Sequence, residues 1–403
     1  MPKERSPAKP TTRSHELARE AVPRIGADVG KLEPAPLRLG LNVGYFGAQL
    51  GASADIIRLA EDVGFDAVWV SEAWGADAIT PLAYLAAKTQ RIRLGTGVMQ
   101  LAGRTPAMCA MQAQTVDALA GGNRVIAGLG VSGPQVVEGW HGQPWGRPYY
   151  RLRDYVQIMR RIFDRGEPVV YQGRELTLPY TGPGATGLGK PLRSMLHNNS
   201  NLPIWLGTGG DAITRLAGEL AQGLLPMHFV PTDFPRIARL VTEGFERAGK
   251  GKGWRDFEVV ARVPVRVTSD VEGALGEMKQ HIAFLVGGMG ARDANFHKAH
   301  MAAAGHMDAA ERVQALFLRG RRAEAAAAVP DGYADNLALL GPPERIRERY
   351  HSWAESGITG LRIQTMEPEA LELMAEIAAA VPAVGPEVAA RRLGDTGQAN
   401  TRT

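Results

Sequence analysis

Short apolar runs alternate with amphipathic segments along most of this 403-residue chain, and glycine-rich turns separate them. The apolar run 37–43 ends at Gly44, and the next segment, 52–64, places its apolar residues at helical spacing. Strands that are joined through helices must run parallel, and right-handed crossovers wind them in one direction. The alternation therefore predicts a repeated βα architecture.

The alternation continues, with interruptions, to about residue 384. The expected strands occupy residues 37–43, 66–70, 92–98, 123–128, 203–206, 224–225, 257–267 and 361–364. The expected helices include residues 52–64, 77–88, 106–119, 151–163, 211–222, 345–356 and 369–380. About eight βα units predict an α/β fold in which a single (β/α)8 TIM barrel is closed. An open doubly wound sheet is the alternative.

The chain around this barrel divides into further segments. Residues 1–36 are rich in proline and charge, which predicts a flexible N-terminal extension. The barrel domain is expected over residues 37–384, and residues 385–403 are expected to form a C-terminal tail. Two insertions interrupt the rhythm, near 171–201, where a hairpin is expected, and near 288–340, which is rich in alanine. Long insertions are often lids or interfaces, so we expect one of these roles for both.

The charge distribution and the cysteine content limit what kinds of molecule this chain is expected to bind. The 46 basic and 42 acidic residues are interspersed, so no clustered footprint for nucleic acid is expected. The single cysteine, Cys109, excludes a disulfide scaffold and is expected in the core of a helix. The polar N-terminus lacks the apolar stretch of a signal peptide, and no run is long enough to span a membrane. We therefore expect a soluble cytoplasmic protein that acts on a small molecule.

Small residues recur where the expected strands end, which is the edge at which barrels bind ligands. They comprise Gly44, Gly97, Gly128, Gly130, Ser132, Gly133, Gly207, Thr208, Gly209 and Gly210. We interpret them as room for a large flat ligand, although ordinary tight turns would need the same residues. The run 207–210 directly precedes a helix, so its amides and the helix N-terminus can hold a phosphate.

A second glycine pattern, Gly-Leu-Gly-Val-Ser-Gly at residues 128–133, has the form of a dinucleotide-binding motif. Pro134 follows it at once, and the acidic residue at the matching distance, Asp154, falls inside an expected helix. We therefore do not interpret it as a nicotinamide site.

Several polar side chains near these strand ends can carry chemistry. Glu72 can orient a ring or donate a proton, unless it pairs with a nearby arginine or caps the next helix. His141 and His228 are candidate acids or phosphate contacts, and Arg104 is either an anion contact or solvated. Three further histidines, at positions 297, 300 and 306, do not match a metal-binding motif, so no metal is expected.

Five segments together are similar to one known family. They are residues 64–72 (GFDAVWVSE), 80–82 (TPL), 91–98 (RIRLGTGV), 128–140 (GLGVSGPQVVEGW) and 206–210 (LGTGG). In this order they resemble the luciferase-like monooxygenase superfamily, in particular its branch that uses the deazaflavin coenzyme F420. The resemblance covers residues 37–380.

The resemblance implies a (β/α)8 barrel with F420 lying across the strand ends. It implies a non-proline cis peptide near Gly97–Val98 behind the deazaflavin ring. It also implies contacts to the cofactor and substrate. The cofactor side comprises Gly44, Glu72, Gly97, Val98, Ser132, Gly133, Pro134, Gly207, Thr208, Gly209 and Gly210. The substrate side comprises Trp74, Gln100 and His228. Several F420 enzymes place histidine where this chain has Ala73, so the expected acid is Glu72, Tyr45 or His141.

The function that follows is a reversible hydride transfer between C5 of F420 and an organic substrate. Two alternatives remain open at this point: an FMN-dependent monooxygenase of the same superfamily, and a protein that binds F420 or a flavin without turnover. Family members often dimerise through barrel helices, so a homodimer is one expected assembly.

Overall fold

All eight strands that the sequence predicts are present, and the sheet they form closes on itself. The computed structural model describes residues 35–44, 53–249, 251–290 and 295–390, which fall in one compact unit. The strands are β1 (Arg38–Val43), β2 (Ala67–Val70), β3 (Arg93–Thr96), β4 (Met99–Gln100), β5 (Val125–Gly130), β8 (Ile204–Thr208), β9 (Gly223–Pro226), β10 (Glu258–Val267), β11 (Leu339–Gly341) and β12 (Gly360–Gln364).

The pairing of these strands is parallel throughout. β1 pairs with β2 on one side and with β12 on the other, and β9 pairs with β10. β4 continues beyond a break after β3, and β11 adds to the far end of β10. The closed (β/α)8 barrel is therefore confirmed, and the alternative of an open doubly wound sheet is wrong.

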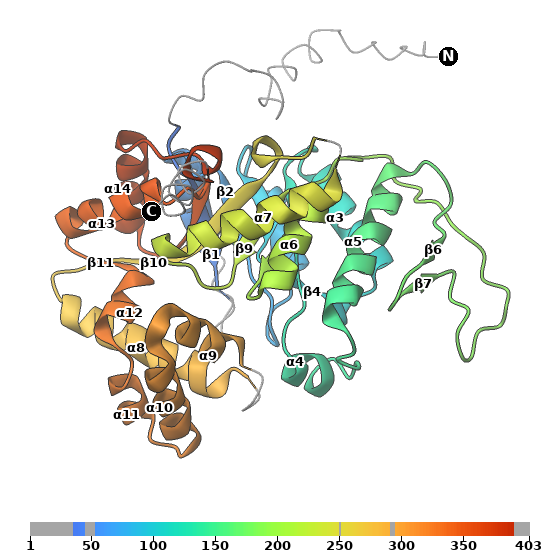
Figure 1. The fold of residues 1–403 in the computed structure, drawn as a ribbon. Helices are drawn as coiled ribbons and strands as arrows, with labels where there is room; N and C mark the ends of the chain where they lie inside the picture. Colours follow the sequence, from blue (N-terminus) through green and yellow to red (C-terminus); the bar gives the residue numbers. More distant parts are fainter. Residues whose placement is uncertain (1–34, 45–52, 250, 291–294, 391–403) are drawn as a thin grey trace, which may run out of the picture. The chain divides into compact units, whose positions relative to one another are not determined.

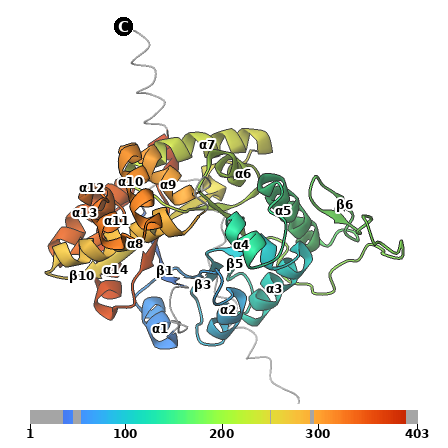
Figure 2. The same cartoon turned by 90° about the horizontal axis from the view of Figure 1, so that it is seen from below.

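Helices surround this barrel (Figures 1 and 2). All but the helix over residues 271–288 bury their apolar sides against it, and that helix packs against the second insertion. The helices are α1 (Ala54–Asp62), α2 (Ile79–Ala86), α3 (Pro106–Leu119), α5 (Pro148–Asp164), α6 (Asp211–Leu220), α7 (Phe234–Ala248), α8 (Val271–Gly288), α13 (Pro343–Glu355) and α14 (Pro368–Ala380). The start of α3 is as predicted, because the Thr105 side chain accepts a hydrogen bond from the Met108 amide and Pro106 takes the first helical position. No helix in the described ranges is long and apolar enough to cross a membrane.

Both insertions have structure of their own. The first contains the predicted hairpin, formed by β6 (Tyr171–Gln172) and β7 (Thr177–Leu178). The second contains α9 (Phe296–Met301), α10 (Met307–Leu318), α11 (Arg322–Ala327) and α12 (Asp331–Asn336). A short helix, α4 (Pro134–Gly139), follows β5. The sequence analysis did not predict α4, α7, α8 or β11. In Figures 1 and 2, α4 and the group α8–α12 lie at the same end of the strands.

The ends of the chain lie mostly outside the described residues. The expected N-terminal extension, 1–36, is described only at its last two residues. Of the expected C-terminal tail, residues 386–390 are helical, and Ala389 is buried.

Two tryptophans fill the inside of the barrel. Trp69 and Trp205 are each 1% exposed, and their ring centroids lie 5.1 Å apart. A Cβ atom on Gly95 would overlap the Trp69 ring, and one on Gly223 would overlap the Trp205 ring. These strand glycines therefore make room for aromatic side chains, because a (β/α)8 interior is a packed core. The packing role of these two glycines was not predicted from the sequence.

We predict that Gly95→Ala destabilises the protein by about 1–3 kcal/mol, because the added methyl group overpacks the interior. The midpoint of urea unfolding should fall accordingly. Gly332→Ala in α12 is the matched control, because its new Cβ meets no atom within 4 Å, and it should change the stability by less than about 0.5 kcal/mol. Equal midpoints for both variants would contradict the packing assigned to Gly95.

Candidate active site

A cavity of about 380 Å³ opens above the tryptophans, at the carboxyl ends of the strands. Most residues predicted for the cofactor and substrate line it. They are Glu72, Trp74, Gly97, Val98, Gln100, Ser132, Gly133, Gly207, Thr208, Gly209, Gly210 and His228. The barrel thus brings together residues from five successive strand ends, as the βα order requires.

Three of the predicted residues that the structure describes do not line this cavity. Gly44 lines a separate cavity with Asn42 and Gln364, and Pro134 begins α4 without reaching the site. His141 lies behind Gln100. Tyr45 lies outside the described residues.

The floor of the cavity is the break between β3 and β4. The Gly97–Val98 peptide bond is cis, as the resemblance implied. The Gly97 carbonyl accepts hydrogen bonds from Ser71 Oγ (3.1 Å) and from the Arg362 guanidinium (3.4 Å). The Val98 side chain fills the space that Gly130 and Gly207 leave, since a Cβ on either glycine would meet it. The Val98 side chain therefore gives this part of the cavity an apolar surface.

Two glycine turns form one rim of the cavity. Ser132 has a positive φ of 59°, which turns the chain into α4. Gly210 caps α6, and its amide donates to Thr208 Oγ1 at 3.2 Å. The amides of the first turn of α6 have no acceptor within the helix, so this turn can bind an anion. A Cβ on Gly210 would meet no protein atom within 4 Å, so the backbone here borders open space.

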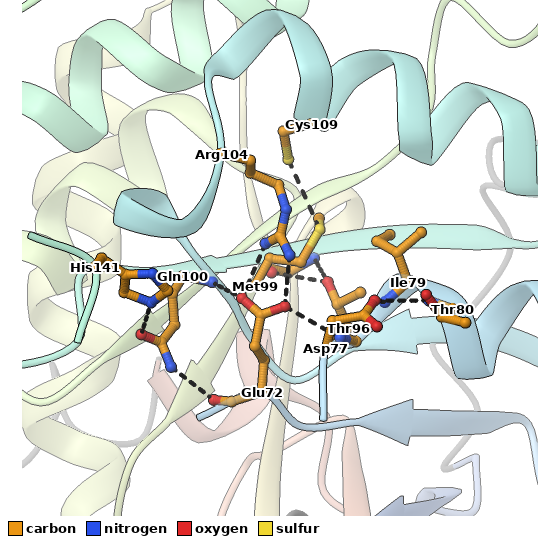
Figure 3. Close-up of polar contacts among 12 residues, drawn as sticks. Glu72, Asp77, Ile79, Thr80, Thr96, Met99, Gln100, Arg104, Cys109 and His141 are labelled. Atoms are coloured by element: carbon orange, nitrogen blue, oxygen red, sulfur yellow. Dashed lines mark hydrogen bonds and ion pairs between the residues drawn. The ribbon is translucent and has the colours of Figure 1, made fainter. Parts of the chain in front are cut away.

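Glu72 is held by four hydrogen bonds (Figure 3). Its carboxylate accepts from both terminal nitrogens of Arg104, at 2.9 and 2.6 Å, and from the amides of Gln100 (2.8 Å) and Ala78 (3.1 Å). The Glu72 and Arg104 side chains are only 6% and 9% exposed. Glu72 therefore pairs with an arginine, which is one of the structural roles left open above. The first turn of α2 is capped by Asp77 instead, which accepts from the amides of Ile79 and Thr80. Arg104 is buried in its pair with Glu72 rather than solvated, and it does not line the cavity.

His141 reaches the cavity only through Gln100. Gln100 Nε2 donates to the Glu72 carbonyl at 3.1 Å, which turns Oε1 towards His141 Nε2 at 3.3 Å. An accepting Oε1 requires His141 to donate from Nε2. On the other side of the Glu72 pair lies Cys109, and burial raises the pKa of its thiol to about 12. This places Cys109 in the core, as predicted.

The cavity is also lined by His228 and His297, and their pairing was not predicted from the sequence. His228 follows β9, and its Nε2 lies 2.6 Å from Nδ1 of His297 in α9. The His228 and His300 rings lie 4.9 Å apart. Within the described ranges, no group of three or more histidine, cysteine or acidic side chains has the arrangement of a metal site. The i, i+3 spacing of His297 and His300 on one helix was the signal available in the sequence.

His228 and His297 share an environment that disfavours the charged form. Burial lowers the pKa of His228 well below its usual value, and His297, His300 and Arg262 lower it further. Burial first, and then Arg262, His281 and His300, lower the pKa of His297 to about 4. The imidazoles are therefore neutral near pH 7.

Sequence comparison shows the family of this chain. The family model of the luciferase-like monooxygenases matches residues 35–360. A protein of Mycobacterium tuberculosis that provisionally carries the name coenzyme F420-dependent oxidoreductase is 42% identical over 327 residues, which are 81% of this chain and 94% of the relative.

Solved structures share the fold. The coenzyme F420-dependent tetrahydromethanopterin reductase from Methanopyrus kandleri has a TM-score of 0.68 at 22% identity, and the match covers 85% of this chain and 98% of that one. A type II Baeyer–Villiger monooxygenase from Pseudomonas putida, in complex with FMN, has a TM-score of 0.59 at 18% identity and is matched over 86% and 100%. At these identities the likeness concerns the fold alone.

We predict that Arg104→Gln lowers the free energy of unfolding by about 3–5 kcal/mol, because it leaves the buried Glu72 carboxylate without its cation. The double variant Glu72→Gln/Arg104→Gln should be more stable than Arg104→Gln alone, since it removes the orphaned charge. Urea unfolding of the three proteins measures both effects. A double variant that is less stable than Arg104→Gln would contradict the pairing.

The lowered pKa of His297 predicts a pH dependence of stability. Unfolding returns its pKa to about 6.5, so the unfolded state binds a proton that the folded state excludes until the pH approaches 4. This destabilises the fold as the pH drops below about 6.5, by about 2 kcal/mol at pH 5. The loss of stability between pH 7 and pH 5 should therefore be about 2 kcal/mol smaller in His297→Gln. The exposed His351 supplies the control variant His351→Gln, and an equal loss in both variants would rule out the assigned environment.

Proposed function

This chain belongs to the luciferase-like monooxygenase family, and from that premise we propose that it is a coenzyme F420-dependent oxidoreductase acting on an organic small molecule. The observation that carries the proposal is the cavity itself. An apolar floor at Gly97–Val98 lies beside a helix N-terminus, on the strand edge where the family places its cofactor. The 42% identical relative with an F420 name supports the choice of cofactor.

The residues present fit a flat coenzyme with a phosphorylated chain. Val98 would back the ring, and the first turn of α6 and the Ser132 turn would hold the phosphate side. Several apolar side chains line the walls and would help to exclude water from the ring. They comprise Val131, Val136, Ile213, Met227, Leu285 and Phe296. Bound F420 would supply a hydride, which carries two electrons, from C5. The protein therefore has to bind and orient the reactants and exclude water from them.

Glu72 acts in this proposal by positioning. Its four hydrogen bonds tie the end of β2 to β4, to α2 and, through Arg104, to the start of α3. A carboxylate with both oxygens occupied is a poor proton donor, so Glu72 shapes the rim and holds the floor strand. His141 fixes the Gln100 side chain, and a role for Tyr45 stays a prediction from the resemblance.

A second candidate is an FMN-dependent monooxygenase. The FMN complex among the structures with this fold favours it. The third candidate is a protein that binds the cofactor without turnover. All three candidate functions would use the same cavity. They can be distinguished by which cofactor binds and by whether a substrate is turned over.

Titration of the purified protein with F420 and with FMN, followed by fluorescence, tests the proposal. We expect F420 to bind at micromolar or lower concentrations and FMN to bind at least about tenfold more weakly. F420 absorbance should then change when a panel of alcohols, ketones and enones is added. Preference for FMN would favour the monooxygenase, and tight F420 binding without turnover on any substrate would favour the binding protein.

The variant Gly210→Asp sharpens this test. Aspartate is a favourable cap and has room at this position, so the stability should not fall. Its carboxylate would repel a phosphate at α6, so F420 affinity should drop at least about tenfold. Gly332→Asp, in the first turn of α12 and away from the cavity, is the matched control. Unchanged F420 affinity in Gly210→Asp would show that the phosphate lies elsewhere.

A further inference from the structure

Two histidines from different parts of the chain meet on the wall of the cavity. His228 follows β9 of the barrel, and His297 belongs to α9 of the second insertion. Both line the cavity, and the 2.6 Å contact joins Nε2 of His228 to Nδ1 of His297. Their rings meet edge to face, with centroids 4.9 Å apart.

We propose that His297 is the acid–base residue of this active site, and that His228 is the positioning residue that fixes its tautomer. The inference rests on the proposed function and deepens it, because it names a substrate class: compounds whose reduction requires a proton, such as ketones, aldehydes and imines.

The other titratable groups of the cavity are poorly placed for this role. Those that line it, in the described part of the chain, are Glu72, His228, Arg262, His297 and Arg362. Arginine stays protonated and cannot exchange a proton at neutral pH. Glu72 is committed to Arg104 and two amides. The two imidazoles are left as the pair that can give and take a proton.

The proton balance of the step follows from the contact between the rings. If His228 donates from Nε2, then Nδ1 of His297 accepts and the proton of His297 sits on Nε2. When hydride adds to a carbonyl carbon, the C=O π bond breaks and its electron pair moves to oxygen. That oxygen takes the Nε2 proton of His297, while Nδ1 of His297 takes the proton of His228. Solvent then returns one proton to the pair, and the oxidation direction reverses each transfer.

The surroundings keep this pair neutral and in place. His300 of α9 lies against the His228 ring, and its own nitrogens contact Tyr333 of α12 (3.2 Å) and Asp233 before α7 (3.5 Å). Arg262 of β10 and His281 of α8 also face the pair and disfavour its protonation. A neutral donor implies a reduction rate that does not depend on pH between about 6 and 8. Without His297, the proton would come from hydronium, and the rate would fall as the pH rises.

Labelling with bromoacetone tests the geometry without F420 and without knowledge of the substrate. This small ketone should bind in the cavity. When the proton of His297 shifts to Nδ1 and is donated to His228 across the 2.6 Å contact, the free lone pair of His297 Nε2 should attack the bromomethyl carbon and release bromide, with a rate that saturates as the concentration of bromoacetone rises. Labelling of the exposed His351 should instead rise linearly and give the background. His228→Gln should slow the labelling of His297 and leave that of His351 unchanged. Labelling of His297 at or below the background rate would overturn the proposal.

Turnover tests the chemistry. With a carbonyl substrate from the panel, His297→Gln should reduce kcat at pH 8 by about 100-fold or more. Its rate should rise as the pH falls towards 6, and its F420 affinity should stay within about twofold of wild type. His228→Gln should reduce kcat by about tenfold, and His351→Gln should leave kcat unchanged. A kcat for His297→Gln equal to wild type, or a pH profile of unchanged shape, would overturn the assignment. Absence of F420 binding in the wild type would instead remove the proposed function, and the labelling result would still decide the geometry.

Discussion

The packing of two tryptophans inside the barrel determines where its cavity begins. Trp69 and Trp205 occupy the volume that strand glycines leave free, and each ring also contacts an arginine, Arg362 and Arg93 respectively, at 5.9 Å. Such aromatic and cation–π contacts hold the rings in one arrangement. Because the lower part of the barrel is solid, the cavity is confined to the strand ends, and its floor is the Gly97–Val98 break.

Two long-range interactions then shape the cavity above that floor. On one side, the Glu72–Arg104 pair joins the ends of β2 and β4 to α2 and α3. On the other side, the contact between His228 and His297 joins the barrel to the second insertion. The first fixes a rim that belongs to the barrel, and the second brings in a group that the barrel strands do not supply. In (β/α)8 enzymes the barrel scaffold is generally shared, and the loops and insertions at the carboxyl ends of the strands supply the catalytic groups. The division seen here follows that pattern.

The barrel could be predicted well from the sequence because the pattern that indicates each βα unit lies within a short stretch of the chain. Apolar periodicity and glycine turns recur in each βα unit, and a closed barrel is the simplest solution for eight such units. Because (β/α)8 barrels bind ligands at the carboxyl ends of their strands, most of the residues that line the cavity could also be predicted. The sequence did not show that Gly95 and Gly223 serve the tryptophans, because a glycine that receives a side chain and one that receives a ligand look the same in a sequence.

The roles of the polar residues were harder to predict for the same reason. Arg104 lies 32 residues from Glu72, and His297 lies 69 residues from His228. These pairs can be recognised only in the folded structure, which brings residues that are far apart in the sequence into contact. His297 also lies in an insertion without a βα rhythm, so the preference of barrels for ligands at strand ends did not point to it.

A crystal structure of the protein with F420 would test the central claim most directly. The account predicts that the deazaflavin ring lies on Val98 above Trp69 and Trp205, with its phosphate at the first turn of α6 and with His297 beside the open face of the ring. Density for F420 outside this cavity, or a ring whose approach requires either tryptophan to move, would contradict it.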